Sequence, residues 1–459
     1  MSRLSSLIYL AFAIGFSVAC GFLISRIIGK SSSLFSPPPS SPLSSPPPLL
    51  PPFSPPLLQV LLPVKAPGIA TFTNVSCEID IPAAANQSAF GNIIPSEYGA
   101  RLALVANLTS KKYYIKANGN FSSADGLRRP ATTDDMFIIQ SVTKMILTAA
   151  LLANGVHTTS TIVDICGPSN CSIPSSFVEK FLIAGNITVN ELIYHTSGLP
   201  DLESDDTVVD NVSVPCSGYE NVSLPLNYLF EAVGQSNATS PRSTIQNLQL
   251  VADHYQLDKS QGYKYSNEGY VVLSHVLEHV TGREWTYAID ELFQNYVPNG
   301  GESQCSARYY RNFTEKVPRR RVVSAYKTFE LNDTQIDCLV WDGVGHDRTF
   351  TMSPILDERI YSNIVGQGGM ACSLQSLANF LLAVINGTIP NVTPQDLTYR
   401  PSLSSDPSIT YFGHPGDTKA FAGVIQPANL LVVGTTSSDL TDAFNIPRLG
   451  YNEAYMGCL

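Results

Sequence analysis

The sequence predicts an α/β fold in which β-strands lie at both ends of the globular part and helices lie between them. Five segments rich in β-branched, aromatic and small apolar residues are expected to be strands, at residues 101–106, 112–117, 409–414, 421–425 and 430–434. Between the two groups, the apolar run at residues 138–152 has helical spacing. A second helix is expected at residues 271–280, closed by Thr281-Gly282. This order predicts one sheet built from both ends of the domain.

Composition indicates a globular protein of an oxidising compartment and argues against nucleic acid as a partner. The chain has 459 residues, 44% of them hydrophobic, which is enough for a large core. Its formal net charge is −10 and no basic patch is visible. Nine cysteines are more than an ordinary cytosolic enzyme carries.

Sequons for asparagine-linked glycosylation are numerous. Thirteen N-x-S/T patterns occur, where chance would give roughly five. They begin at Asn74, Asn86, Asn107, Asn120, Asn170, Asn186, Asn211, Asn221, Asn237, Asn312, Asn332, Asn386 and Asn391. We therefore expect a glycoprotein of the secretory pathway in which some sequons are unused.

The N-terminal segment predicts attachment to a membrane. Residues 4–25 carry no charge and are long enough to cross a bilayer as a helix. Every sequon lies downstream, so the body is expected to be lumenal or extracellular. A cleaved signal peptide is the alternative, because residues 17–20 supply the small side chains that a signal peptidase needs. A secreted protein would then result.

Composition divides the chain into three parts. Residues 1–30 hold the membrane anchor or signal peptide. Residues 31–76 begin with a stretch dominated by Pro, Ser and Leu, which cannot form a core and is expected to be an extended stalk. Residues 77–459 have a globular composition and are predicted to form one domain.

A serine and a lysine three positions apart, Ser141 and Lys144, stand at the start of the first apolar helical run. Three residues are nearly one helical turn, so the two side chains point to the same side. Lysine can act as the base for a serine nucleophile if burial lowers the lysine pKa from about 10.4 to near 7. The same spacing occurs at Ser324 and Lys327, but no apolar helix follows there.

A tyrosine and an asparagine, Tyr265 and Asn267, open the second expected helix. The stretch between Ser141 and Tyr265 leaves room for a helical subdomain that presents this Y-x-N pattern. A second Y-x-N pattern begins at Tyr361, but it lies too close to Ser324 to leave such room. We therefore reject the pair formed by Ser324 and Tyr361.

Taken together, the motifs resemble the serine β-lactamase and penicillin-binding-protein superfamily, in its class C β-lactamase and D-alanyl-D-alanine carboxypeptidase branch. The similar segments occur in family order at residues 137–144, 191–201, 263–282, 366–386 and 413–421. The resemblance implies a β-lactamase/transpeptidase-like fold: a five-stranded antiparallel sheet flanked by helices, with an inserted all-helical subdomain. Ile139 and Gln140 depart from the family pattern, which commonly has smaller or basic residues there, and Ala420 stands where glycine is usual.

The resemblance also implies a serine hydrolase that forms an acyl-enzyme. Ser141 would attack an acyl carbonyl, and Lys144 and Tyr265 would share the proton transfer in a proportion that the sequence leaves open. The substrate-binding residues would be Asn267, His414, Gly416 and Asp417. The backbone N–H groups of Ser141 and Asp417 are expected to form the oxyanion hole. No cofactor and no metal are expected.

His414 bears on the substrate. Many β-lactamases have a lysine there, which holds the substrate carboxylate, whereas histidine is mostly neutral at pH 7. Esters, small amides or peptides are therefore expected in preference to anionic β-lactams. A true β-lactamase and a catalytically inactive cell-surface glycoprotein are the alternatives. We expect His195 to have a structural role.

The helix that follows Tyr265 also contains the H-x-x-E-H spacing of inverted zinc peptidases. We expect a buried stripe made of Val272, Leu273, Val276, Leu277 and Val280, and a solvent face made of Ser274, His275, Glu278 and His279. No third ligand is indicated, so a solvated helix face is the preferred interpretation.

Eight cysteines remain when Cys20 is set aside, enough for four disulfides of undetermined connectivity. Cys166 and Cys171 bracket a Gly-Pro turn and are the first expected pair. Cys305 with Cys338 is a weaker expectation.

Overall fold

The computed structural model divides the chain into two units, Met1–Gln59 and Val60–Leu459. All of the described residues belong to the second unit. They are residues 67–76, 101–122, 128–167, 171–201, 211–216, 219–225, 244–299, 305–306, 322–323, 326–330, 350–354, 368, 370–397, 410–416, 420–426 and 428–436.

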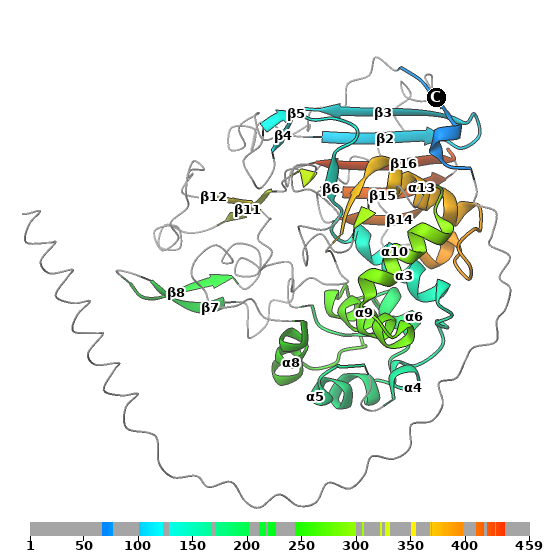
Figure 1. Ribbon diagram of the computed structural model, residues 1–459. Helices are drawn as coiled ribbons and strands as arrows, with labels where there is room; N and C mark the ends of the chain where they lie inside the picture. Colours follow the sequence, from blue (N-terminus) through cyan, green and yellow to red (C-terminus); the bar gives the residue numbers. More distant parts are fainter. Residues whose placement is uncertain are drawn as a thin grey trace, which may run out of the picture. The chain divides into compact units, whose positions relative to one another are not determined.

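A six-stranded sheet forms the centre of this unit. Its strands, in spatial order, are β1 (Thr73–Asn74), β3 (Lys112–Asn118), β2 (Arg101–Asn107), β16 (Leu430–Thr436), β15 (Ala420–Gln426) and β14 (Thr410–Gly416). Every neighbouring pair is antiparallel except β1 with β3. Figure 1 shows the cyan strands β2 and β3 beside the red and orange strands β16, β15 and β14. The predicted five-stranded antiparallel sheet from both ends of the domain is confirmed, and β1 adds a short parallel edge.

The end of the predicted stalk belongs to the folded domain, which corrects its expected boundary at residue 76. The 3-10 helix η1 (Ile69–Thr71) buries Ile69, and Phe72 is buried beside it. The backbone N–H of Ile69 donates to Asn379 Oδ1 at 2.8 Å. These apolar residues follow the Pro-rich stretch and can be buried, whereas its prolines cannot form a core. Residues 31–66 lie outside the described residues, so a stalk there stays a prediction.

Two apolar helices pack on the sheet. Helix α13 (Leu374–Ile385) contacts β2, β15 and β16, and α3 (Val142–Ala153) contacts β14 and β15. Every residue of α3 from Val142 to Leu152 is buried. The sheet covers one side of this helix, and α9 and α10 cover the side that the sheet leaves uncovered. A helix that is apolar all round is one that is enclosed on all sides. The helix predicted within residues 138–152 is therefore confirmed as a central core element.

Helix α9 (Asn267–Thr281) starts four residues earlier than predicted, at the asparagine of the Y-x-N pattern. Ser266 caps its N-terminus by accepting from the N–H of Gly269, and Gly282 ends it in the left-handed conformation. Helix α10 (Trp285–Tyr296) follows and packs on α9 and α3. Three expectations about α9 were wrong. Ser274 is buried with its hydroxyl donating to Val271 O, and the side chain of His275 is only 11% exposed with both ring nitrogens buried. Val280 is 39% exposed because it lies in the last turn.

Among the described residues between α3 and α9, most of the regular secondary structure is helical. This segment contains α4 (Ile162–Cys166), α5 (Ser175–Phe177), the π-helical η3 (Val178–Ile183), α6 (Val189–Ile193) and α8 (Thr244–His254). It also contains an antiparallel hairpin, β7 (Asn211–Cys216) with β8 (Tyr219–Pro225), so the expectation of an all-helical subdomain was wrong in this respect. Both strands alternate polar and apolar residues, which is the period of a strand and not of a helix.

A small second sheet leads into the first motif. Its order is β10 (Val322–Val323), β6 (Met136–Ile138), β13 (Ala371–Ser373) and β9 (Cys305–Ser306). Cys305 lies opposite Cys372 and forms a disulfide with it, so the expected partner Cys338 was wrong. The pairing depends on the contact between β9 and β13, which links distant parts of the sequence. The expected disulfide between Cys166 and Cys171 is confirmed.

The remaining described elements are short. They are the hairpins β4 (Asn120–Ser122) with β5 (Arg128–Pro130) and β11 (Tyr326–Glu330) with β12 (Phe350–Pro354), and the 3-10 helix η7 (Pro394–Leu397). Lys327 lies in β11, so the rejected serine–lysine pattern does not start a helix. Within the described ranges no helix is long and apolar enough to span a membrane. Residues 4–25 lie outside those ranges, so the anchor stays a prediction.

Gly413 allows the close approach of β14 to β15 and provides a test of this register. Its φ is +135°, and a Cβ there would overlap the carbonyl group of Ala422 and the Cα of Gly423. We expect Gly413→Ala to lower the free energy of unfolding by about 3 kcal/mol or more, measured by urea denaturation. Gly155→Ala is the matched control, because Gly155 also has positive φ but nothing within 4 Å of the added Cβ. The control should cost about 1 kcal/mol, and equal losses would contradict the register.

Candidate active site

Ser141 lies between β6 and α3 and is the N-cap residue of α3. Ile139 is fully buried, and its N–H donates to the carbonyl oxygen of Met370 at 3.0 Å. The N–H of Met370 donates in turn to Thr143 Oγ1 at 3.3 Å. Gln140 has a φ of +43°, which turns the chain sharply just before the serine. Of the residues that depart from the family pattern, Ile139 is therefore a core residue and Gln140 a strained turn residue.

Lys144 is completely buried one turn into α3. Its Nζ donates to Ser141 Oγ at 2.9 Å and to Asn267 Oδ1 at 2.7 Å. The same nitrogen lies over the rings of Tyr265 and Tyr270, 5.1 Å and 5.6 Å from their centroids. A buried amine needs such partners because burial removes its hydration. The three-residue spacing of Ser141 and Lys144 therefore brings the two side chains into direct contact.

Tyr265 also contacts Ser141. Its hydroxyl lies 2.8 Å from Ser141 Oγ, so the serine hydroxyl is in hydrogen-bond contact with two candidate bases. Tyr265 immediately precedes the cap of α9, and Asn267 is the first residue of that helix. The structure thus brings together Ser141, Lys144, Tyr265 and Asn267, as the sequence predicted, and their catalytic roles stay predictions.

Two loops hold the Y-x-N element in place, at residues 195–201 and 255–266. The N–H of Lys264 donates to the carbonyl oxygen of His195 at 2.7 Å, and that of Asp258 donates to Gly198 O at 3.0 Å. The hydroxyl of Ser266 donates to Pro200 O at 2.8 Å. Gly198 has a φ of +74°, and a Cβ there would overlap the backbone of Asp258. The glycine of the H-T-S-G sequence is therefore required for this close pairing of loops.

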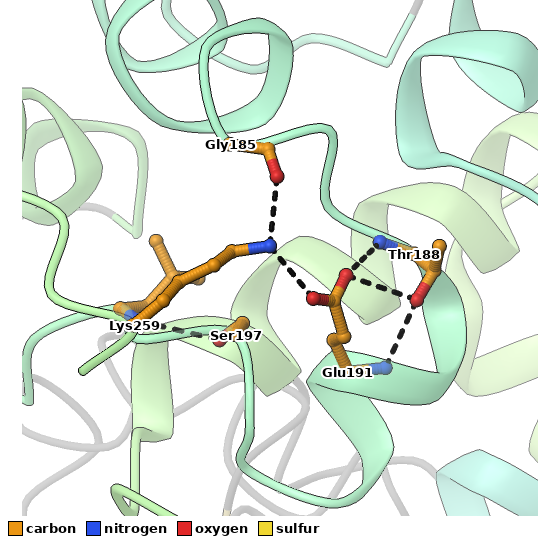
Figure 2. A network of polar contacts seen from close by, with 6 residues as sticks. Gly185, Thr188, Glu191, Ser197 and Lys259 are labelled. Atoms are coloured by element: carbon orange, nitrogen blue, oxygen red, sulfur yellow. Dashed lines mark hydrogen bonds and ion pairs between the residues drawn. The ribbon is translucent and has the colours of Figure 1, made fainter. Parts of the chain in front are cut away.

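A partly exposed ion pair, drawn in Figure 2, joins the loop at residues 255–266 to helix α6. Lys259 donates to Glu191 Oε1 at 2.6 Å and to Gly185 O at 2.7 Å. Glu191 also forms a capping box with Thr188 at the start of α6. Burial alone would raise the pKa of Glu191, but hydrogen bonds from Lys259 and Thr188 hold it below its usual value. This pair is partly exposed and therefore adds little stability by itself.

His195 packs directly against the ring of Tyr265. It is buried, and its ring stacks on that of Tyr265 with centroids 4.3 Å apart and planes at 31°. Its Nδ1 accepts from the N–H of Ser266 at 3.1 Å. Burial lowers the pKa of His195 well below 6.5, and the nearby Lys144 and His414 lower it further. A neutral imidazole thus supports the Tyr265 ring, which agrees with the expected structural role.

Asp201 is a site residue that the sequence analysis did not single out. It is 1% exposed, and its Oδ1 accepts from the backbone N–H of Asn267 at 3.3 Å and from Asn267 Nδ2 at 3.1 Å. An acidic residue between Pro200 and Leu202, at the end of a family-like segment, was the available signal. What it contacts depends on the folded pairing of the two loops.

The family-like segment at residues 413–421 starts on β14, which is an edge strand. The absence of an N–H at Pro415 is tolerated there. His414 is buried opposite Ala422 of β15, and β14 contacts helix α3, which Ser141 begins. Gly416 is the last residue of the strand. Asp417 lies outside the described residues, so its contribution to an oxyanion hole stays a prediction.

The zinc interpretation of α9 gains no support from the side chains. His275 Nδ1 lies 3.3 Å from Glu278 Oε2, and His279 is exposed. Glu278 Oε1 also accepts from the N–H of Trp285 at 3.4 Å. Within the part of the chain that the structure describes, no group of three His, Cys, Asp or Glu residues could hold a metal ion.

Residues 94–450 match the protein-family model Beta-lactamase. The chain therefore belongs to the beta-lactamase family, within the superfamily of serine β-lactamases, penicillin-binding proteins and D-amino acid amidases, whose members are serine hydrolases. No curated protein matches the chain.

Solved structures of similar fold include an amidase, an amidohydrolase and a hydrolase with acyltransferase activity. D-amino acid amidase from Ochrobactrum anthropi SV3 has a TM-score of 0.54 and 18% identity, over 82% of this chain and 97% of that one. D-stereospecific amidohydrolase from Streptomyces sp. has a TM-score of 0.51 and 16% identity, over 81% and 99%. EstCE1, a hydrolase with promiscuous acyltransferase activity, has a TM-score of 0.51 and 16% identity, over 80% and 96%. At these identities the likeness establishes the fold, and the predicted superfamily is confirmed.

The lowered pKa of His195 predicts a pH dependence of stability. Below about pH 6.5 the unfolded chain protonates this histidine while the folded chain resists, so stability falls as pH drops, by up to about 1.4 kcal/mol per pH unit. His195→Asn keeps an acceptor for Ser266 N–H, and asparagine tolerates the φ of +55° found here. We expect the variant to lose less stability than the wild type between pH 7 and 5 in urea unfolding. His279→Asn, on an exposed side chain, should keep the wild-type slope, and an unchanged slope in His195→Asn would contradict a neutral buried imidazole.

Proposed function

We propose that the protein is a serine hydrolase that forms an acyl-enzyme on Ser141 and cleaves esters or small amides and peptides. The observation that carries this proposal is the position of Ser141 Oγ, 2.8 Å from Tyr265 Oη and 2.9 Å from Lys144 Nζ. Nucleophile and base must lie within hydrogen-bond distance for the serine proton to be removed during attack. Family membership supports hydrolysis in general, and this contact supports the specific nucleophile.

In the acylation step, Ser141 Oγ forms a bond to the substrate carbonyl carbon, and its proton passes to Tyr265 or Lys144. The tetrahedral intermediate then collapses with cleavage of the bond to the leaving alcohol or amine, which takes up that proton. In deacylation, water attacks the acyl carbon, gives a proton to the same base, and releases the carboxylic acid and free Ser141. No cofactor is needed, because each step moves only a proton and an acyl group.

The two candidate bases share their surroundings. The amine of Lys144 lies over the Tyr265 ring and also contacts Ser141, so a proton can pass among the three groups without large movement. A nearby lysine cation favours the phenolate form of a tyrosine. We propose that Tyr265 receives the serine proton and that Lys144 supplies the positive charge, with Asn267 holding Lys144 in position.

The substrate class rests on His414 and on the family. Lysine would offer a fixed cation at this position, whereas histidine offers a neutral donor at pH 7 and grips a carboxylate less firmly. The fold neighbours are named as amidases and as a hydrolase with acyltransferase activity, which makes amides and esters the first substrates to test. A true β-lactamase is the second candidate, because the matching family model is Beta-lactamase.

The cellular setting is proposed from the sequence. The apolar run at residues 4–25 and the thirteen downstream sequons support a single-pass or secreted glycoprotein with a lumenal or extracellular catalytic domain. Among the described residues, the disulfides Cys166–Cys171 and Cys305–Cys372 are consistent with an oxidising compartment.

Labelling by a fluorophosphonate tests the nucleophile. Wild-type protein should be labelled on Ser141, and Ser141→Ala should lose both labelling and hydrolysis, because its methyl group cannot attack a carbonyl. Ser324→Ala is the matched control from the same S-x-x-K spacing and should keep both. Treatment with a chelator should change neither. Labelling that persists in Ser141→Ala would contradict the assigned nucleophile, and an unlabelled wild type would favour an inactive glycoprotein.

Replacement of His414 tests the substrate class. The measurement is the ratio of kcat/KM for anionic over neutral esters at pH 8. His414→Lys should raise this ratio by about ten- to thirty-fold, because a charge-assisted contact is worth about 1–2 kcal/mol more than a neutral one. A wild type that prefers penicillins, or a ratio unchanged in His414→Lys, would contradict this role.

A further inference from the structure

The amide of Asn267 lies between a basic and an acidic side chain, both buried. Its Oδ1 accepts from Lys144 Nζ at 2.7 Å, and its Nδ2 donates to Asp201 Oδ1 at 3.1 Å. Lys144 and Asp201 are 0% and 1% exposed, so water does not compete for either contact. The three side chains form a continuous hydrogen-bonded row that ends at Ser141 Oγ.

We propose that Asp201 is a positioning residue that fixes the orientation of the Asn267 amide and, through it, the position of Lys144 against Ser141. The proposal rests on the proposed function, because it concerns the same nucleophile and base. It assigns a task to a carboxylate at the end of the 195–201 loop, outside the serine, lysine, tyrosine and asparagine that the motifs define.

Hydrogen-bonding capacity is the reason that Asp201 can set this orientation. An ammonium group only donates and a carboxylate only accepts, whereas an amide has one accepting end and one donating end. With Asp201 present, only one orientation of Asn267 satisfies both neighbours. The opposite orientation would place its NH₂ against the Lys144 amine and its oxygen against the carboxylate, which is repulsive at both ends.

The carboxylate is itself held in place by the start of α9. Its Oδ1 also accepts from the backbone N–H of Asn267, the first residue of the helix, at 3.3 Å. Free N–H groups and the helix dipole favour a negative charge at that end. The neighbouring bond from Ser266 Oγ to Pro200 O fixes the loop just before Asp201. Asp201 is therefore anchored independently of Lys144, as a positioning residue must be.

A double-mutant cycle tests whether Asp201 acts through Asn267. The measurement is the rate at which a fluorophosphonate labels Ser141, because this rate reports attack by the serine without the polar contacts of a natural substrate. We expect Asp201→Ala to slow labelling by about a hundred-fold in the wild-type background, since a small misplacement of reacting groups has an effect of this size. In the Asn267→Ala background the same change should slow labelling by less than about three-fold. Equal losses in both backgrounds, or no loss in the wild type, would overturn the proposal.

Two further variants separate positioning from general support of the fold. Asp201→Asn keeps an oxygen that can accept from Asn267, so it should recover about ten-fold of the labelling rate lost in Asp201→Ala. Glu191→Gln weakens the ion pair that ties the 255–266 loop to helix α6 through Lys259 but does not touch Asn267, and it should label within about three-fold of the wild type. An Asp201→Asn variant as slow as Asp201→Ala, or a Glu191→Gln variant slowed equally, would contradict a specific action on the amide.

Thermal unfolding distinguishes failure of this proposal from failure of the proposed function. It is measured on the four proteins of the double-mutant cycle: the wild type, Asp201→Ala, Asn267→Ala and the double variant. If the wild type is not labelled, the proposed function fails and the unfolding cycle alone decides the role of Asp201. We expect Asp201→Ala to lower Tm by about 2–4 °C in the wild type and by clearly less in Asn267→Ala, where the bond to Nδ2 is already absent. The same decrease in both backgrounds would overturn the contact between Asp201 and the Asn267 amide.

Discussion

The complete burial of Lys144 is the constraint on which the rest of the site depends. An amine without hydration must be given partners by the protein, and here these are Ser141, Asn267 and the faces of two tyrosine rings. Each partner comes from an element whose position is fixed by something else. The sheet and the helices α9 and α10 enclose α3, so the lysine cannot turn toward water. Reactivity of the serine therefore arises from packing as much as from the motif itself.

The loops at residues 195–201 and 255–266 convert this packing into a defined geometry. Their backbone hydrogen bonds hold Tyr265 against Ser141, and α3 holds Lys144 against the same serine. Because Gly198 permits the backbones to touch, the spacing between these loops has little freedom. His195 stays neutral beneath Tyr265 and so adds no second positive charge beside Lys144. The result is a site in which the Lys144 amine is surrounded by aromatic and amide groups.

Much of this could be predicted from sequence because the signals are local. The five sheet strands and helix α3 are each contained in a short stretch with a clear period. The parts that could not be predicted depend on contacts between distant segments. Cys305 pairs with Cys372 because β9 lies beside β13. Ile69 is held in the core because its backbone N–H donates to Asn379, far along the chain. Asp201 contacts Asn267 only when its loop folds against the start of α9. The acidic residue alone therefore did not reveal this contact in the sequence.

The central pairing of the sheet has a consequence for how the protein is made. Strand β2 pairs with β16, so that Asn107 lies opposite Leu430. During synthesis the first strands emerge from the ribosome long before their partners exist, and α3 is translated without the strands β14 and β15 on which it packs. Such long-range closure is slow compared with the formation of local hairpins and helices. The nascent chain must therefore keep the apolar α3 from aggregating until almost the whole domain has been translated, a task suited to chaperones that bind exposed hydrophobic segments.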